Sequence, residues 1–306
     1  MECYNICGNR RIAWEIGREF ARTFDREQHQ AGFSRLFSGF EFEESDESSV
    51  VIATPKNDWI IRYRLKTKPR FRLFCFPYAG AGASVFNGWD GILPEAVDIC
   101  SIQLPGRETR RKETAYTRVF PMIDALYEVL EHYLELPYSI YGHSMGALLG
   151  FEIAREFRRQ AKPLPVSLLI SGCRAPQLRD PHRPMHQLPD PEFIGRLRQM
   201  DGTPEDVLRN RELMEVLLPA LRADFALCET YKYLAEPPLP GAICAFGGMD
   251  DPRATRDQLA AWSQQTSGSF NLRMLPGNHF FVRNPSTLFL RFISQRLEED
   301  LRRASV

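Results

Sequence analysis

The chain has no net charge, because its 39 basic side chains are balanced by 39 acidic ones. Proteins whose main partner is nucleic acid need a clear basic excess to bind phosphates, so this balance argues against such a partner. The 306 residues also contain no apolar run near the ~18 residues that a membrane-spanning helix requires. The first residues show no basic segment followed by an apolar one, and we therefore expect neither a secretory signal nor a membrane partner.

Cysteine is sparse and irregularly placed. The seven cysteines are an odd number, and several lie inside apolar runs. This pattern is typical of reduced, buried thiols, so we expect a cytoplasmic protein without a disulfide framework. His182 and His186 have the spacing of metal ligands on a helix, but nearby prolines interrupt any helix and no cysteine or carboxylate cluster completes a site. We expect no metal.

From residue 71 onward, short apolar runs alternate with longer segments of helical periodicity. The apolar runs predict strands at 71–76, 99–104, 138–141, 166–171, 242–246 and 270–274. The other segments predict helices near 120–135, 145–160, 253–266 and 286–302. Apolar strands spaced by helices indicate an α/β fold, with a mostly parallel sheet that helices cover on both faces.

Residues 176–240 depart from this alternation. They offer no convincing strand, only proline-rich turns and helical stretches around 190–200, 204–210 and 211–234. An insertion of that size between two strands predicts a helical lid over a site. The alternative is a purely structural helical subdomain.

The residues before the alternation form an extension, residues 1–57. Its first part predicts an amphipathic helix, with an apolar stripe at Ile12, Ile16, Phe20 and Phe24. Residues 41–49 carry five carboxylates and no base, which indicates a solvated linker. Short strands are predicted at 50–54 and 59–65. The stripe would pack on the body of the protein, on another chain or on a larger partner.

Residues 141–146, Tyr-Gly-His-Ser-Met-Gly, stand between a predicted strand and a predicted helix. A Gly-x-Ser-x-Gly string in that setting predicts a nucleophile elbow, in which Ser144 is held at the end of the sheet. Gly142 and Gly146 suit a tight turn with backbone close by. The helix that follows has an apolar face at 149, 153 and 157 and charged residues on the other side, among them Glu152 and Arg155.

A serine hydroxyl needs a base to act as a nucleophile. Of the six histidines, His279 follows the last predicted strand and a turn, which is where hydrolases with a serine elbow place that base. His143 adjoins the serine and is expected to pack beneath the elbow. The acid that orients the base belongs after strand 242–246, where two aspartates compete. We favour Asp251, which precedes a proline, over Asp250.

An oxyanion needs two N–H donors. One should be the amide of Met145, the residue after the nucleophile, and the other should come from the loop 77–82. Ala79 is the preferred donor in that loop, with Tyr78 as the alternative. The loop lacks the Lys-Ser/Thr of a P-loop and the spacing of a dinucleotide fingerprint, so a nucleotide site is not favoured.

Four motifs occur in a fixed order along the chain. They are Phe-Cys-Phe-Pro-Tyr-Ala-Gly at 74–80, Leu-Pro-Gly-Arg-Glu at 104–108, Gly-His-Ser-Met-Gly at 142–146 and Leu-Pro-Gly-Asn-His-Phe at 275–280. Together they resemble the type II thioesterases of non-ribosomal peptide and polyketide pathways, over roughly residues 58–300. Two mild departures are Gly80-Ala81-Gly82, where a Gly-Gly pair is more usual, and Asn278, which replaces a common glycine.

The resemblance implies an α/β-hydrolase fold over residues 58–306, with a lid at about 176–240. It implies hydrolysis of acyl groups from the phosphopantetheine arm of an acyl or peptidyl carrier protein, with Ser144, Asp251 and His279 as the triad. Because the arm belongs to the partner, no cofactor is expected. A carrier with an acidic recognition helix would favour a basic rim, and the run of Arg107, Arg110, Arg111 and Lys112 could supply it or could be a solvated loop.

Other functions remain open from the sequence. A chain-releasing thioesterase or a medium-chain acyl-carrier-protein thioesterase would use the same triad. A small-molecule esterase or lipase would act without a carrier protein. A non-catalytic hydrolase fold that serves as a binding module is the alternative from a different class.

Overall fold

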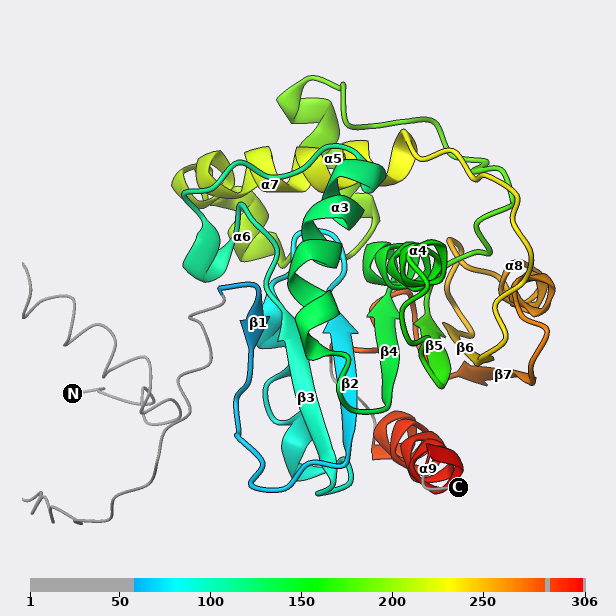
Figure 1. Ribbon diagram of the computed structural model, residues 1–306. Helices are drawn as coiled ribbons and strands as arrows, with labels where there is room; N and C mark the ends of the chain where they lie inside the picture. Colours follow the sequence, from blue (N-terminus) through cyan, green and yellow to red (C-terminus); the bar gives the residue numbers. More distant parts are fainter. Residues whose placement is uncertain (1–57, 284–286, 305–306) are drawn as a thin grey trace, which may run out of the picture. The chain divides into compact units, whose positions relative to one another are not determined.

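The computed structural model describes residues 58–283 and 287–304 (Figure 1). The expectations for the extension at residues 1–57 lie outside these described residues. None of the helices in the described ranges is long and apolar enough to cross a bilayer.

Seven strands within the described residues form one sheet, in the order β1-β3-β2-β4-β5-β6-β7. The strands are β1 (Ile60–Ile61), β2 (Phe71–Phe76), β3 (Val97–Ile102), β4 (Tyr138–His143), β5 (Ser167–Ser171), β6 (Ala242–Gly248) and β7 (Phe270–Leu275). The edge strand β1 pairs antiparallel with β3, and every other neighbouring pair is parallel. The predicted α/β fold with a mostly parallel sheet is confirmed.

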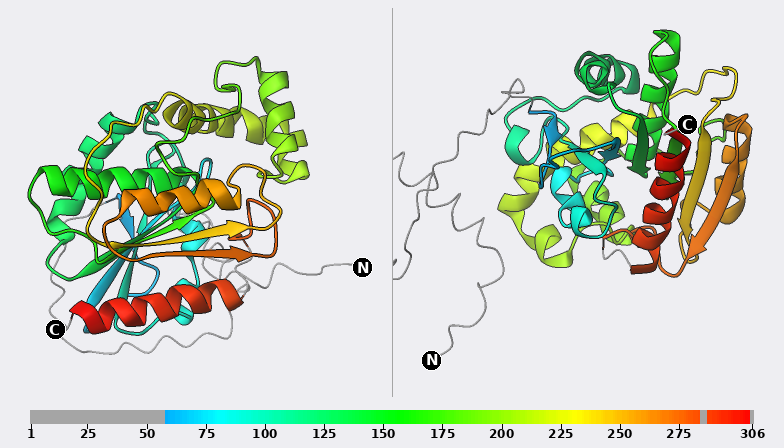
Figure 2. Two further views of the ribbon diagram at one scale, coloured as in Figure 1. Left: turned by 90° about the vertical axis from the view of Figure 1, so that its right-hand side faces the viewer. Right: turned by 60° about the horizontal axis from the view of Figure 1, so that its bottom comes forward.

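Helices cover both faces of the sheet. One face packs against α3 (Val119–Leu130), α4 (Met145–Arg159) and α8 (Arg256–Ala260). The other face packs against α9 (Thr287–Ala304) and the short turns after β2. Figure 2 (left) shows α4 and α8 on one side of the strands and α9 on the opposite side.

Strand β2 shows why the apolar runs of this sequence form central strands. Phe74 and Phe76 pack with the helices of one face, whereas Leu73 and Cys75 pack with the other face. Because successive side chains of a strand point to opposite faces, a strand that is buried on both faces needs apolar residues throughout.

Several predicted boundaries were wrong. The predicted strand 59–65 is reduced to Ile60–Ile61, because it lies at the sheet edge and pairs only with Ile102 and Ser101. The predicted helix 253–266 is divided into α8 and a 3-10 helix at Ala261–Gln265.

The insertion between β5 and β6 is helical, as predicted. It contains α5 (Asp190–Gln199), α6 (Glu205–Arg209) and α7 (Arg211–Glu229), which lie beyond the ends of the strands toward which the arrows point (Figure 1). These helices share an apolar cluster of their own, formed by Met185, Phe193, Leu197, Leu208, Met214, Leu221 and Phe225. The insertion therefore has a small core, separate from the two cores of the sheet.

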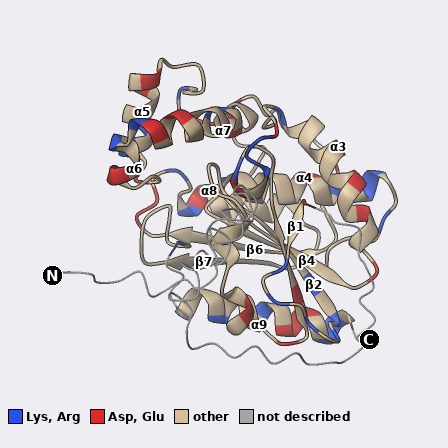
Figure 3. Cartoon of the chain, turned by 90° about the vertical axis from the view of Figure 1, so that its left-hand side faces the viewer, with Lys and Arg blue, Asp and Glu red and all other residues tan. Residues whose placement is uncertain are grey.

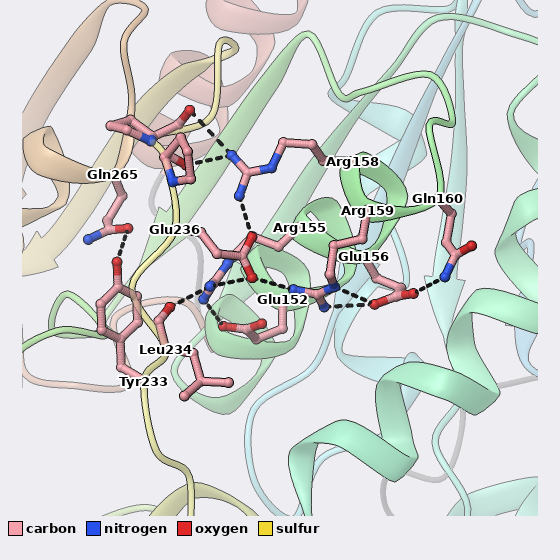
Figure 4. A network of polar contacts seen from close by, with 12 residues as sticks. Glu152, Arg155, Glu156, Arg158, Arg159, Gln160, Tyr233, Leu234, Glu236 and Gln265 are labelled. Carbon is pink, nitrogen blue, oxygen red and sulfur yellow. Dashed lines mark hydrogen bonds and ion pairs between the residues drawn. The ribbon is translucent and has the colours of Figure 1, made fainter.

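After α7 the chain returns to β6 along helix α4, and we call residues 230–238 the strap. Glu236 of the strap forms ion pairs with Arg155, Arg158 and Arg159 of α4 (Figure 4). Tyr231 of the strap donates a hydrogen bond of 2.6 Å to a carboxylate oxygen of Glu152. These contacts hold the strap against α4, the helix that follows Ser144.

The strap also covers charged residues of α4. Glu152 and Arg155 belong to the charged side of this helix, yet they are only 0% and 2% exposed. Arg155 forms an ion pair of 2.7 Å with Glu152, so the two charges neutralise each other under the strap. These charged residues of α4 thus form an internal contact surface with the strap.

Candidate active site

Ser144 lies at the tip of a tight turn between β4 and α4. Its backbone has φ 53° and ψ −115°, a conformation that side chains rarely adopt. A Cβ at Gly142 would lie 2.3 Å from the carbonyl oxygen of Gly146, and a Cβ at Gly146 would lie 2.1 Å from that of Phe76. Both glycines are therefore required by close backbone, as predicted.

The structure brings together the three side chains that the sequence predicts as nucleophile, base and acid. His279 Nε2 lies 3.1 Å from Ser144 Oγ, and His279 Nδ1 lies 2.8 Å from Asp251 Oδ2. Asp251 follows β6 and His279 follows β7, so adjacent parallel strands deliver acid and base to the same edge of the sheet. Asp250 is exposed, and its backbone N–H donates to the carbonyl of Gly277.

The Asp251 carboxylate is buried and hydrogen-bonded. Burial alone would raise the pKa of this carboxyl group, but the hydrogen bond and charge of His279 and the backbone N–H of Arg253 hold the pKa below its ordinary value. The group is therefore ionised at neutral pH. An ionised carboxylate at Nδ1 orients the imidazole and stabilises its protonated form.

His143 packs beneath the elbow, as predicted. It is fully buried, its Nδ1 lies 3.0 Å from Ser171 Oγ, and its ring centroid lies 5.0 Å from that of His279. Burial and the neighbouring His279 lower the pKa of His143 well below its ordinary value, so this ring stays neutral. His143 supports the base without competing for its proton.

Two backbone N–H groups near the serine have no hydrogen-bond acceptor in the described part of the chain. They belong to Ala79 and Met145, and both residues line the same cavity as Ser144. Tyr78–Ala81 is a turn, closed by a hydrogen bond of 3.0 Å from the Ala81 N–H to the Tyr78 carbonyl, with Gly80 at φ 79°. Two free N–H donors beside a nucleophile are the arrangement that an oxyanion requires.

The cavity over Ser144 encloses about 1020 Å³. The core contributes Ser144 and His279 to its wall, and the insertion contributes Leu197, Leu221 and Phe225. A cavity of this size lies at the upper end of the range for ligand pockets, and the insertion supplies apolar side chains to its wall.

The family of the chain follows from comparison with known proteins. The family model described as a thioesterase domain matches residues 71–297. The gramicidin S biosynthesis protein GrsT of Aneurinibacillus migulanus is 41% identical over 241 residues, which cover 79% of this chain and 94% of GrsT. The chain belongs to the thioesterase family.

Solved structures extend this result to the fold. The thioesterase is 35% identical to RedJ, a thioesterase from the prodiginine pathway of Streptomyces coelicolor, with a TM-score of 0.70 over 82% of this chain and 99% of RedJ. It is 33% identical to BorB, a type II thioesterase from the borrelidin biosynthetic cluster, with a TM-score of 0.71 over 81% and 98% of the two chains. The resemblance to type II thioesterases and the α/β-hydrolase fold are thereby confirmed.

The expected basic rim is wrong for two of its four residues. The side chains of Arg107 and Arg110 are buried in the thioesterase. Arg107 pairs with Asp224 of α7, and Arg110 pairs with Glu113 and stacks on Trp59, with its guanidinium carbon 3.9 Å from the ring centroid. Arg111 and Lys112 are exposed, as a rim would require.

A different set of arginines lies at the cavity of the thioesterase. Arg179, Arg183, Arg196 and Arg253 line it, and no carboxylate in the described ranges lies within ion-pair distance of any of them. Helices α5 and α6 carry charges of both signs (Figure 3). The sequence did not single out these arginines, because they come from three separate segments that only the fold brings together.

His182 and His186, which have the spacing of metal ligands, each contact a different carboxylate. His182 Nδ1 lies 3.0 Å from Asp180, and His186 Nδ1 lies 2.6 Å from Glu229. In the part of the thioesterase that the structure describes, no three His, Cys, Asp or Glu side chains form a group able to bind a metal ion.

Proposed function

We propose that this thioesterase hydrolyses acyl thioesters on the phosphopantetheine arms of acyl or peptidyl carrier proteins, and so clears groups that block a peptide or polyketide synthase. The observation that carries the proposal is the hydrogen-bonded series Ser144–His279–Asp251 at the wall of a cavity of about 1020 Å³. Relatives that act in gramicidin S, prodiginine and borrelidin biosynthesis support the pathway class.

The reaction proceeds in two halves. In the first half, His279 Nε2 takes the Ser144 hydroxyl proton as Oγ attacks the thioester carbonyl, and the amides of Ala79 and Met145 stabilise the oxyanion. The carbon–sulfur bond then breaks, and the thiol leaves with the proton from Nε2. In the second half, His279 deprotonates a water molecule that attacks the acyl-serine carbonyl. The carbon–Oγ bond then breaks, Oγ takes the proton back from Nε2, and the carboxylic acid is released from free Ser144.

The arginines at the cavity suit the arm that carries the substrate. A phosphopantetheine arm is attached through a phosphodiester, which is an anion about one arm's length from the thioester. Arg179, Arg183, Arg196 and Arg253 provide guanidinium groups without a carboxylate partner in the described ranges. A planar guanidinium donates two parallel hydrogen bonds to phosphate oxygens, which favours a carrier-bound substrate over a free acyl ester.

The remaining proposals concern organisation and location. Residues 58–306 form the hydrolase domain, the insertion at about 176–240 acts as its lid, and residues 1–57 are an extension. The protein works in the cytoplasm, which is supported by five cysteines without disulfides among the described residues. The arm is part of the partner, so the enzyme needs no cofactor of its own.

The proposal is tested with carrier proteins loaded with acyl groups of different length, each compared with the matching free thioester. The wild type should release acid from the carriers faster, and Ser144→Ala should abolish release while it leaves the thermal unfolding temperature unchanged. A fluorophosphonate should label the wild type and not the variant. Undiminished turnover by Ser144→Ala would remove the assignment of the nucleophile, and preference for free esters would favour a small-molecule esterase.

A further inference from the structure

A buried carboxylate of the insertion contacts the loop that carries a proposed oxyanion donor. Asp224 of α7 is 1% exposed, and it is not among the residues that line the cavity. Its Oδ2 accepts a hydrogen bond of 2.7 Å from the backbone N–H of Gly80, the residue after Ala79. The mechanism assigns this side chain no role.

The same carboxylate is paired with a buried arginine of the core. Arg107 Nη1 and Nη2 lie 2.6 Å and 2.8 Å from Asp224 Oδ2 and Oδ1, which is a bidentate ion pair. Arg107 also donates to the carbonyl of Pro105, at 3.2 Å and 3.0 Å, and to the carbonyl of Ala81, at 3.4 Å. The guanidinium therefore joins the carboxylate to Ala81, at the end of the turn formed by residues 78–81, and to the loop after β3.

Helix α7 also contacts this turn directly through Leu221. A Cβ at Gly80 would lie 2.5 Å from Leu221 Cδ2, so any other residue here would displace that side chain of the helix. Gly80 has φ 79°, which glycine adopts without strain. The Gly80 N–H thus donates to Asp224, while the Ala79 N–H has no acceptor among the described residues.

We propose that Asp224 is a positioning residue for the oxyanion hole: it fixes the turn so that the Ala79 amide points at the reacting carbonyl only when α7 is seated. The inference rests on the proposed function, because it takes Ala79 as an oxyanion donor. The contact between α7 and the turn then also completes the oxyanion hole. Preorganised donors gain most of their effect from fixed orientation, so a loosened turn lowers the rate of chemistry and not substrate binding.

The test compares Asp224→Asn and Asp224→Glu with the wild type, on a small acyl thioester that needs no carrier. Asn removes the charge that pairs with Arg107, and Glu keeps the charge but moves the carboxylate by one methylene. We expect kcat per fluorophosphonate-titrated site to fall by about 10- to 100-fold in Asp224→Asn, with KM nearly unchanged. The phosphonylation rate of Ser144 should fall in parallel. Should the Asn variant fail to fold, the Glu variant carries the test, with a smaller fall in the same two quantities.

Met214→Ala is the matched control, because Met214 lies on the same helix, in the apolar cluster of the insertion and away from the turn. It should lower the unfolding temperature and leave kcat per titrated site unchanged. The proposal is overturned if the Asp224 variants lose stability but keep wild-type kcat per site, or if only their KM rises. If the carrier assay failed, the proposed function would be refuted. The comparison of the Asp224 variants could still be interpreted, because it uses a small thioester without a carrier.

Discussion

Ser144 is held in a strained backbone conformation by the hydrogen bonds around it. Its N–H donates to the Ser171 carbonyl at 2.8 Å, and its own carbonyl accepts from the N–H groups of Ala147 and Leu148. A residue in such a sparsely populated region costs of order 1–3 kcal/mol and persists only where its neighbours determine it. The hydrogen bond to β5 thus helps to stabilise the strained conformation of Ser144, whose hydroxyl lies beside His279.

The two adjacent aspartates give a prediction at the level of single atoms. Asp251→Asn should lower kcat by roughly 10³- to 10⁴-fold, because an amide at His279 Nδ1 favours the wrong tautomer and cannot stabilise its cation. Asp250→Asn should change kcat by no more than about twofold, because Asp250 is exposed and contributes only a backbone N–H. Steady-state rates on one acyl thioester measure both, and a larger loss in Asp250→Asn would reverse the assignment.

Single residues differ in how far the sequence alone could place them. Ser144, Asp251 and His279 each follow a strand within a few residues, so local motifs and strand order were enough. Arg107 was misassigned because its partner, Asp224, is 117 residues away in the chain. The only local signal is that Asp224 lies in the mostly apolar segment 217–227, whose one other charged residue is Arg222, and this does not identify its partner.

At the scale of elements, the strap and α4 form a charged interface whose strength depends on pH. Partial burial disfavours the charge on Glu236, yet hydrogen bonds from Arg155 and Arg158 lower its pKa to about 2. A carboxyl group whose pKa is lower in the folded state stabilises the fold above its ordinary value, and this stabilisation is lost as the pH falls through the folded value.

Glu236→Gln should therefore lower the free energy of unfolding by about 1–3 kcal/mol at pH 7. The difference from the wild type should stay constant down to about pH 5 and shrink as the pH approaches 2, because the wild type then loses the same charge. Urea unfolding across this range measures it. Glu156→Gln is the control on α4, the helix that carries the arginine partners of Glu236. Its i,i+3 pair with Arg159 contributes about 0.3–0.5 kcal/mol. Equal losses in the two variants would show that the strap adds nothing.

Elements were predictable where they pack in a periodic way. The central strands and α4 were placed within a few residues, because apolar runs and turns mark their ends. Helix α7 was expected to reach residue 234 but ends at Glu229, since Tyr231 and Tyr233 leave the helix to hydrogen-bond Glu152 and Gln265. Periodicity could not reveal this, because the contacts that end the helix lie in other segments.

At the scale of the whole molecule, the role that we propose for the arginines at the cavity predicts a difference between a carrier-bound and a free substrate. A double variant, Arg183→Gln with Arg196→Gln, should raise KM for an acyl carrier by about 3- to 10-fold and leave the values for the matching free thioester unchanged. Arg111→Gln with Lys112→Gln is the control pair, because both side chains are exposed and lie outside the cavity wall. A larger effect of the control pair would indicate that the carrier protein binds at the segment after β3, which contains Arg111 and Lys112.

The order of the functional residues along the chain also determines when the active site is completed during synthesis. The Gly80 N–H meets Asp224 across 144 residues of chain, and Ser144 meets His279 across 135. Since contacts between distant segments form only after both have left the ribosome, a nascent chain shorter than 279 residues holds a serine without its base. The site that we propose for thioester hydrolysis is therefore completed only when the last strand of the sheet is in place.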